Sequence, residues 1–441
     1  MTPAGNSAGT RTGPVARSSV ARVGVATAIT AVCGYAVLYL AARALDPAGF
    51  SVFAVFWGAF GLVTGAANGL LQEATREVRT SSYHRAEPPG AEPPGAEPPG
   101  AEPSGAEPQG ADPHGPFTRP IWIAAGVGLA SAIVIAGTAP LWAARVFAEQ
   151  RPLSVALLSV GLAGFCLHAT LLGMLAGVGR WTEYGSLMVT DAVIRVVIAG
   201  AAFAVGWGLA GFLWATVGGA VAWLLLLAVS APARGAAGLR TAGTVKEFLS
   251  GTAHSIAAAG ASAILVMGFP VLLKATSGQL GATGGVVILA VTLTRAPLLV
   301  PLTAMQGNLI AHFVDHRAAR LRALAAPAGV VLVVGLVGVA AAGLLGPWLL
   351  RVAFGEEYQA GGPLLAWLTA GAVSIALLTV TGAATVAAAL HRPYSLGWVG
   401  ATVAAALLLT MPLDLQTRTV VALLCGPLVG IAVHLTALAR A

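Results

Sequence analysis

Charge is what this chain has least of. Asp, Glu, Lys and Arg together make up 9% of the 441 residues, while 57% are hydrophobic. A soluble domain usually carries about 25% charged residues, so this chain has too few to cover a water-exposed surface. The composition therefore predicts an integral membrane protein. The net charge of +7 does not indicate nucleic-acid binding, because the arginines lie between apolar runs rather than in a basic patch interleaved with aromatics.

Sequence signatures of enzymes and metal sites are missing as well. Lysine occurs only at Lys246 and Lys274, and neither belongs to a GxxxxGK[ST] phosphate-binding loop. The sequence also contains no HExxH and no GxSxG motif. The three cysteines, Cys33, Cys166 and Cys425, lie singly in apolar runs without CxxC or zinc-ligand spacing. We therefore expect no enzyme activity, no cofactor and no metal site.

What the chain has instead is long apolar runs. Twelve of them reach the roughly 20 residues that a membrane-spanning helix needs. With the N-terminus in the cytoplasm, 16 Arg and Lys residues fall in cytoplasmic segments and six in outer ones, as the positive-inside rule requires. We predict an all-α multi-pass protein of the cytoplasmic (plasma) membrane, with both termini cytoplasmic. The predicted helices start near Arg22, Gly49, Pro120, Ser154, Tyr184, Gly208, Gly251, Gly284, Ala325, Pro363, Tyr394 and Val420.

One segment, 86–115, has the opposite character. It reads AEPPG three times, followed by AEPSG, AEPQG and ADPHG. A proline in each unit prevents a regular helix, and the missing apolar residues leave nothing to bury. We expect a disordered, acidic, polyproline-like cytoplasmic loop. A docking or spacer element and a tolerated repeat expansion both fit this composition.

The chain also contains an internal duplication. The LDPAG turn and the apolar run after it return in weaker form at 280–300, with Leu45 and Gly49 matching Leu280 and Gly284. A second match pairs GRWTEYGSL at 179–187 with HRPYSLGWV at 391–399. The two offsets differ by an amount close to the length of the acidic loop, which lies only in the first half. We predict a six-helix lobe over 1–230, a cytoplasmic linker over 231–250 and a second six-helix lobe over 251–441, related as parallel repeats.

Three stretches resemble a known family. ARALDPAGFSVFAVFW, GRWTEYGSLMVTDAVIRVV and HRPYSLGWVG are similar to segments of polysaccharide transporters. These form the lipid-linked oligosaccharide flippase branch of the multidrug/oligosaccharidyl-lipid/polysaccharide exporter superfamily. The resemblance implies two six-helix lobes around a central cavity. It also implies movement of an undecaprenyl-linked sugar from the inner to the outer leaflet, alongside a polysaccharide polymerase or glycosyltransferases.

Ionisable residues inside the apolar runs are the candidate site residues, because a charge near the bilayer centre costs about 2.5–3.5 kcal/mol. Asp191 and Arg195 are four residues apart and therefore share a helix face, with the acid first, the better order for an ion pair. One interpretation is a self-neutralised structural pair. The other is a cavity-facing pair, with Arg195 binding an anionic substrate and Asp191 coupling an ion or proton.

Arg295 lies near the middle of its apolar run, with no acid within four residues. Pro297 and Pro301 follow, and we expect them to kink or locally break the helix. A guanidinium beside a broken helix fits a phosphate site, because arginine binds phosphate through a planar fork of donors. The alternative is an ion pair with a carboxylate from another helix, for which Asp191 is the obvious candidate.

Three histidines, His168, His254 and His434, each lie in an apolar run. For a lone histidine in such a run, a hydrogen bond to a neighbouring backbone group or hydroxyl is the simpler interpretation, and a proton relay is the alternative.

Composition and charge indicate a twelve-helix membrane protein with a few buried charges. The resemblance implies that it is a transporter or flippase for a polyprenyl-pyrophosphate-linked oligosaccharide used in surface polysaccharide assembly. Arg295 and Arg195 would attract the pyrophosphate while the lipid tail stays in the bilayer. One alternative is a cation-coupled multidrug exporter of the same superfamily, although Asp191 is the only acid deep in an apolar run. The other is a non-transporting membrane scaffold of a polysaccharide assembly complex, which has no need of a buried Arg295.

Overall fold

The apolar runs fold into helices. The computed structural model describes residues 17–86, 117–316 and 320–440. Two short strands, β1 (Phe117–Thr118) and β2 (Thr241–Ala242), pair antiparallel, and a 3-10 turn, η1 (Gly219–Val221), separates α6 from α7. The helices are α1 (Arg17–Ala44), α2 (Pro47–Ala86), α3 (Pro120–Val146), α4 (Arg151–Gly177), α5 (Trp181–Ala204), α6 (Gly208–Gly218), α7 (Ala222–Val229), α8 (Ala231–Ala237), α9 (Val245–Val266), α10 (Phe269–Ser277), α11 (Gly281–Ala304), α12 (Gln306–Asp315), α13 (Arg320–Ala323), α14 (Ala325–Phe354), α15 (Gly362–Ala387), α16 (His391–Leu409) and α17 (Leu415–Arg440).

The LDPAG turn shows how the sequence starts a helix. Asp46 accepts a hydrogen bond from the backbone N–H of Gly49 (2.9 Å), which satisfies one of the free donors of the first turn. Pro47 is the first residue of α2, a position where its missing N–H costs nothing. The chain therefore leaves α1 and enters α2 within two residues.

Eleven helical segments in the described part of the chain are long and apolar enough to cross a membrane. The predicted all-α multi-pass architecture is confirmed. The remaining predicted span is present as α16 but is not among the eleven. Its first turn contains His391 and Arg392, which lower the hydropathy of a helix of only 19 residues.

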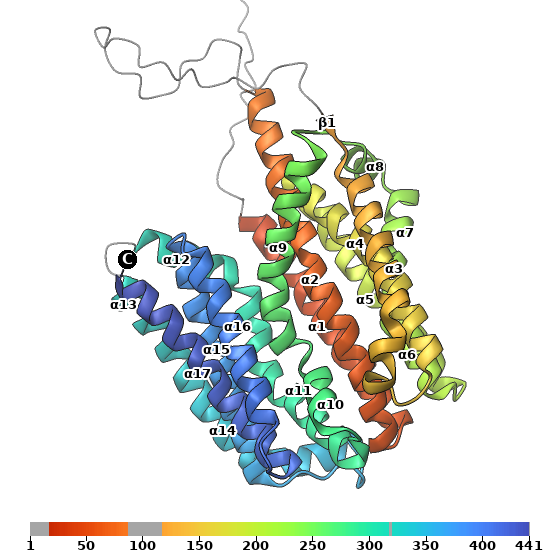
Figure 1. Ribbon diagram of the computed structural model, residues 1–441, viewed down its shortest axis with the longest axis vertical. Helices are drawn as coiled ribbons and strands as arrows, with labels where there is room; N and C mark the ends of the chain where they lie inside the picture. Colours follow the sequence, from red (N-terminus) through yellow and green to blue (C-terminus); the bar gives the residue numbers. More distant parts are fainter. Residues whose placement is uncertain (1–16, 87–116, 317–319, 441) are drawn as a thin grey trace, which may run out of the picture.

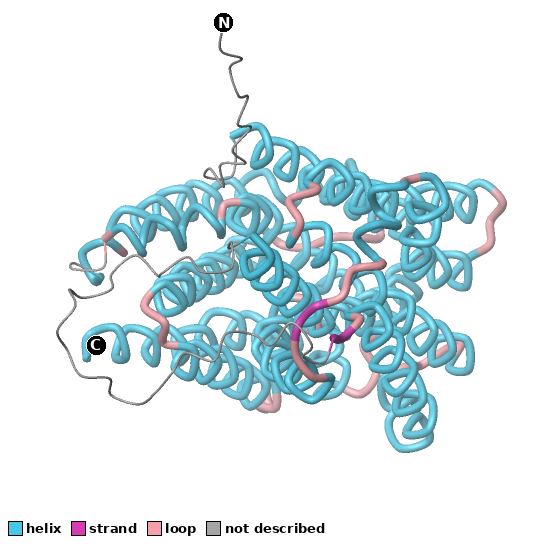
Figure 2. Tube along the Cα trace, turned by 90° about the horizontal axis from the view of Figure 1, so that it is seen from above, coloured by secondary structure: helices cyan, strands magenta, loops and turns pink. Residues whose placement is uncertain are grey.

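The spans form two groups that follow the order of the chain. In the first, α1 packs on α5, and α2 and α3 pack on α4; in the second, α14 packs on α15, and both α15 and α16 pack on α17. Figure 1 shows α12 to α17 on one side of the molecule and α3 to α6 on the other, with α9 between them. The strands β1 and β2 lie at the end that faces the viewer in Figure 2.

The turns that precede α5 and α16 share one hydrogen-bonding pattern. The N–H of Arg180 bonds to the carbonyl of Leu175 (2.8 Å), and the N–H of Leu390 bonds to the carbonyl of Thr385 (2.9 Å). Both turns also use a residue with positive φ directly before that donor. By this pattern Arg180 corresponds to Leu390, two residues before the Arg392 of the predicted match. The duplication itself stays a prediction.

The two helices of the predicted duplication, α2 and α11, are in contact. The backbone of α11 at Gly285 approaches the carbonyl oxygen of Pro47 at the start of α2 so closely that a Cβ would clash with it. Close by, the Tyr358 hydroxyl donates to the carbonyl oxygen of Leu45 (3.0 Å) and its ring packs edge-on against Phe50. These contacts define the closed end of the molecule, where the largest hydrophobic core crosses between the halves.

The segment predicted as a linker, 231–250, contains α8, β2 and the first turn of α9. α9 begins at Val245, earlier than the predicted Gly251, because Thr244 and Glu247 form a capping box: each side chain accepts the other's backbone N–H. α9 then packs along α2. The predicted disordered acidic loop, 86–115, lies outside the described residues except for Ala86, which ends α2.

Candidate functional site

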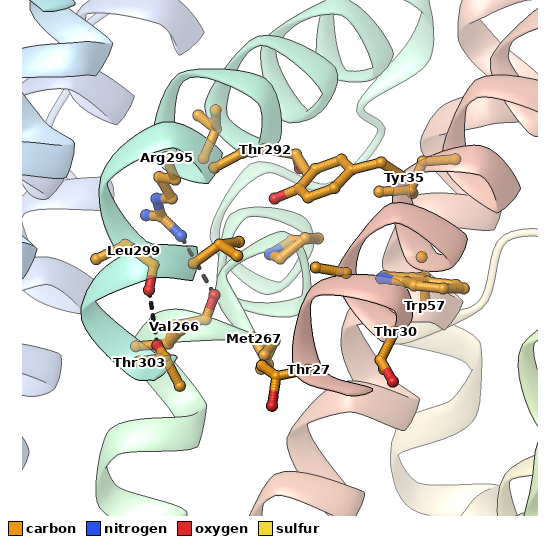
Figure 3. A pocket seen from close by; sticks show the side chains of 17 residues that line it. Thr27, Thr30, Tyr35, Trp57, Val266, Met267, Thr292, Arg295, Leu299 and Thr303 are labelled. Atoms are coloured by element: carbon orange, nitrogen blue, oxygen red, sulfur yellow. Dashed lines mark hydrogen bonds between the residues drawn. The ribbon is translucent and has the colours of Figure 1, made fainter. Parts of the chain in front are cut away.

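A cavity of about 350 Å³ lies between the two halves, bounded by α1, α2, the α9–α10 junction and α11. Figure 3 shows Tyr35 and Trp57 on one wall and Arg295 on the other. Thr27, near the start of α1, and Thr303, near the end of α11, also line it. Both lie away from the closed end, so the cavity opens on the other side of the contact between α2 and α11.

Among the described residues that line the cavity, Arg295 is the only one with a charged side chain, and it is only 7% exposed. Its Nη1 donates to the carbonyl oxygen of Val266 (3.3 Å), and its guanidinium lies over the ring of Phe269, 5.0 Å from the centroid. Its Nε and Nη2 have no hydrogen-bond partner. Two nitrogens of this cation are therefore buried without a partner, and none of the described carboxylates forms an ion pair with it.

The carbonyl that holds Arg295 is free because of a proline. Val266 is the last residue of α9, and in a continuous helix its carbonyl would accept from the residue four positions later. That residue is Pro270, which has no N–H. The helix breaks at Met267 and Gly268 and resumes as α10, and Nη1 of Arg295 takes the vacant acceptor.

The expected break at Pro297 and Pro301 is not observed. α11 runs through both prolines to Ala304, and the helix interruption comes afterwards at Met305. Membrane helices tolerate proline where surrounding groups compensate the freed carbonyl. A broken helix does lie beside the guanidinium, as expected, but it belongs to the neighbouring α9 and α10 and not to the helix of Arg295.

Asp191 is not the partner of Arg295. Its Oδ1 lies 3.0 Å from Nη2 of Arg195 on the same helix, and no described carboxylate is within 4.0 Å of Arg295. The pair packs against the backbone of Gly219, where a side chain would clash with both residues, and Arg195 also lies over the ring of Phe60.

The structure therefore brings Asp191 and Arg195 together but does not bring Arg195 to Arg295. Arg195 is absent from the lining of the central cavity and lies among α2, α5 and η1 of the first half. The spacing of four residues predicted the ion pair correctly. It could not show which neighbouring helices the shared face contacts.

Two of the three histidines lie within hydrogen-bonding distance of neighbouring backbone or hydroxyl groups. Nδ1 of His254 lies 2.7 Å from the carbonyl oxygen of Ser250. His434 lies within hydrogen-bonding distance of the Thr381 hydroxyl and the Tyr394 carbonyl. His168 is buried and stacks on Phe165, and its Nδ1 has no hydrogen-bond partner.

Sequence reasoning missed Tyr35, Trp57 and Pro270 as site residues. Pro270 carried a usable signal, because a proline two residues after Gly268 inside an apolar run marks a helix break. Tyr35 and Trp57 carried none, since aromatic residues are frequent in membrane helices and face lipid as often as a cavity.

Comparison with known proteins gives relatives along the whole chain, although no family model matches. "Uncharacterized protein Rv3630" of Mycobacterium tuberculosis is 67% identical over 438 residues, covering 99% of this chain and 96% of the relative. "Uncharacterized protein Mb3654" of Mycobacterium bovis has the same values. "Uncharacterized protein Rv1510" of Mycobacterium tuberculosis is 64% identical over 429 residues, covering 97% and 93%.

Solved structures with a similar fold are far more distant in sequence. An inward-facing multidrug resistance MATE family transporter of the MOP superfamily aligns with a TM-score of 0.64 and 15% identity, covering 96% of this chain and 98% of that one. An outward-facing structure of such a transporter aligns with a TM-score of 0.60 and 15% identity, covering 97% and 96%. The chain therefore has the two-lobe fold of these proteins.

Proposed function

The chain belongs to the same family as the mycobacterial proteins Rv3630 and Rv1510 and has the MATE fold, and we propose that it transports an anionic lipid-linked sugar across the cytoplasmic membrane. The observation that carries this proposal is Arg295. A charge near mid-membrane costs about 2.5–3.5 kcal/mol, and leaving its donors unsatisfied adds about 1–3 kcal/mol. A cargo that supplies the missing anion repays both costs.

The remaining walls of the cavity favour an amphiphilic cargo. Trp57, Val291 and Leu299 give it a largely apolar lining, while Arg295 offers a planar fork that matches phosphate. A polyprenyl lipid that carries a sugar through a phosphate linkage combines these properties. It is also the cargo class that the sequence resemblance implies, for use by polysaccharide polymerases or glycosyltransferases.

The arrangement of the two halves supports alternating access. They are in contact at the closed end through Pro47 and Gly285 and through Leu45 and Tyr358, and the cavity lies on the other side of that contact. Cargo would enter from the cytoplasmic side, where its anion pairs with Arg295. Rearrangement of the two halves would then expose it to the outer leaflet while the lipid tail remains in the bilayer.

A complementation assay for surface polysaccharide, run beside thermal unfolding in detergent, tests the proposal. Arg295→Ala should abolish complementation while the protein still folds, because the anion loses its partner. Arg295→Lys should retain part of the activity, since an ammonium keeps the charge but not the fork. Arg351→Ala, which removes an exposed arginine of the same half, is the matched control. Full complementation by a stable Arg295→Ala protein would contradict the proposal.

The second candidate is a cation-coupled multidrug exporter. It is favoured by the solved structures of the same fold, which include a multidrug resistance MATE family transporter, and by Asp191 as a candidate coupling residue in the first half. Two features count against it. Asp191 is already neutralised by Arg195, and the cavity's one charged side chain would repel an organic cation. Export of cationic dyes that depends on Asp191 and not on Arg295 would favour this candidate.

A further inference from the structure

We infer that the cargo's linkage to its lipid is a single phosphodiester carrying one negative charge and a headgroup of one or two sugar rings, rather than a pyrophosphate with a long oligosaccharide. This inference rests on the proposed function and narrows the substrate class of the same cavity. It departs from the pyrophosphate-linked cargo that the sequence resemblance implies.

The guanidinium has one edge without a hydrogen-bond partner. Nη1 donates to the carbonyl of Val266, and one face of the planar guanidinium lies over the ring of Phe269. The two donors without partners, Nε and Nη2, are adjacent and parallel, the arrangement that grips two oxygens of one phosphate or carboxylate. Both atoms are buried in this conformation, so a shift of the side chain has to bring this edge to the cavity. There it can hold one phosphate group side-on, and the guanidinium has no second edge for another.

The charge of the cavity points the same way. In the part of the chain that the structure describes, its lining contains one cation, Arg295, and otherwise apolar or hydroxyl side chains. One phosphodiester brings this apolar space to neutrality. A pyrophosphate diester carries a second negative charge, and a buried charge without a partner is strongly unfavourable.

The size and polarity of the cavity limit the headgroup. About 350 Å³ is at the small end of the range of about 300–1,000 Å³ that ligand pockets span. Hydroxyl groups are few: Thr30, whose buried Oγ1 has no hydrogen-bond partner, Tyr35, and three further threonines on α1 and α11. A long oligosaccharide would leave many of its own hydroxyls unpaired here, whereas one or two rings match this supply.

Binding to the purified full-length protein in nanodiscs tests the inference. Three probes share one polyprenyl chain: a phosphate-linked mannose, a pyrophosphate-linked mannose and a neutral mannoside. The wild type should bind the phosphate-linked probe about tenfold more tightly than either of the others, the worth of one compensated charge contact. Arg295→Gln should remove this preference, and Arg351→Gln should leave it intact.

A second variant adds the charge that the cavity lacks. Thr292 lines the cavity one turn before Arg295, so Thr292→Lys supplies a second cation beside the first. The ratio of pyrophosphate to phosphate affinity should rise about tenfold in this variant. If the variant does not fold, the preference of the wild type for the phosphate-linked over the pyrophosphate-linked probe is the test of the inference.

The outcomes separate the two proposals. Wild-type protein that binds the pyrophosphate probe as tightly as the phosphate probe or more tightly, with binding still lost in Arg295→Gln, would overturn the single-phosphate inference and leave the proposed function standing. Equal binding of all three probes, or of none, would overturn both.

Discussion

Nη1 of Arg295 donates to the carbonyl oxygen of Val266, the acceptor that Pro270 leaves free in the broken helix α9–α10. One proline therefore orients a cation on a different helix, because it withholds the N–H that would otherwise occupy that carbonyl. The tether fixes Nη1 (Figure 3), and Nε and Nη2 are buried without a hydrogen-bond partner.

Pro270→Ala tests this tether. The new N–H can compete for the Val266 carbonyl, so Arg295 loses its orientation while the protein keeps its fold. We expect affinity for anionic cargo to fall about tenfold, since a hydrogen bond to a charged group contributes about 1.5–3 kcal/mol. Cargo binding measured beside thermal unfolding gives the answer. Unchanged binding in a protein of unchanged stability would show that the tether does not position Arg295.

The Asp191–Arg195 pair predicts a different outcome. Its side chains are 12% and 16% exposed, so removal of one partner leaves a largely buried charge. Asp191→Asn should therefore destabilise the protein by about 3–5 kcal/mol, as measured by thermal unfolding. The double variant Asp191→Leu with Arg195→Met should recover most of the stability and retain transport. A stable double variant that no longer transports would instead assign ion coupling to Asp191.

Gly69 sets the spacing between α2 and α9. A Cβ at this position would clash with the backbone at Ile256, and backbone cannot move aside as a flexible side chain can. Gly69→Ala should lower the free energy of unfolding by about 1–3 kcal/mol through overpacking. Gly137→Ala in α3, where a Cβ meets nothing within 4 Å, is the matched control and should be neutral or slightly stabilising. Equal effects of the two changes would show that the helices do not depend on this close approach.

The sequence predicted those features that depend on local composition. Apolar runs predicted the membrane helices, and the LDPAG turn predicted the start of α2. The absence of a nearby acid marked Arg295 as a cation without a local partner. Each of these features is determined by residues within one short stretch of the chain.

Features that depend on packing between distant segments could not be predicted in this way. The pairing of Arg295 with Val266 joins two helices, and no local pattern links them. Pro297 and Pro301 follow Arg295 on the same helix, so the sequence predicted the helix break there. The break lies instead before Pro270, which frees the carbonyl that Arg295 binds. Arg195 has the same residue type as Arg295, yet contacts with Phe60 and Gly219 hold it inside the first half.

The most direct test of the account is the rate at which a polyprenyl phosphate sugar crosses the bilayer of proteoliposomes that contain the full-length protein. The wild type should move this lipid between leaflets. Arg295→Lys should move it more slowly, and Arg295→Ala should reduce movement to the level of protein-free vesicles while its thermal unfolding stays close to that of the wild type. A stable Arg295→Ala protein that moves the lipid at the wild-type rate would contradict the claim that this arginine binds the cargo's anion.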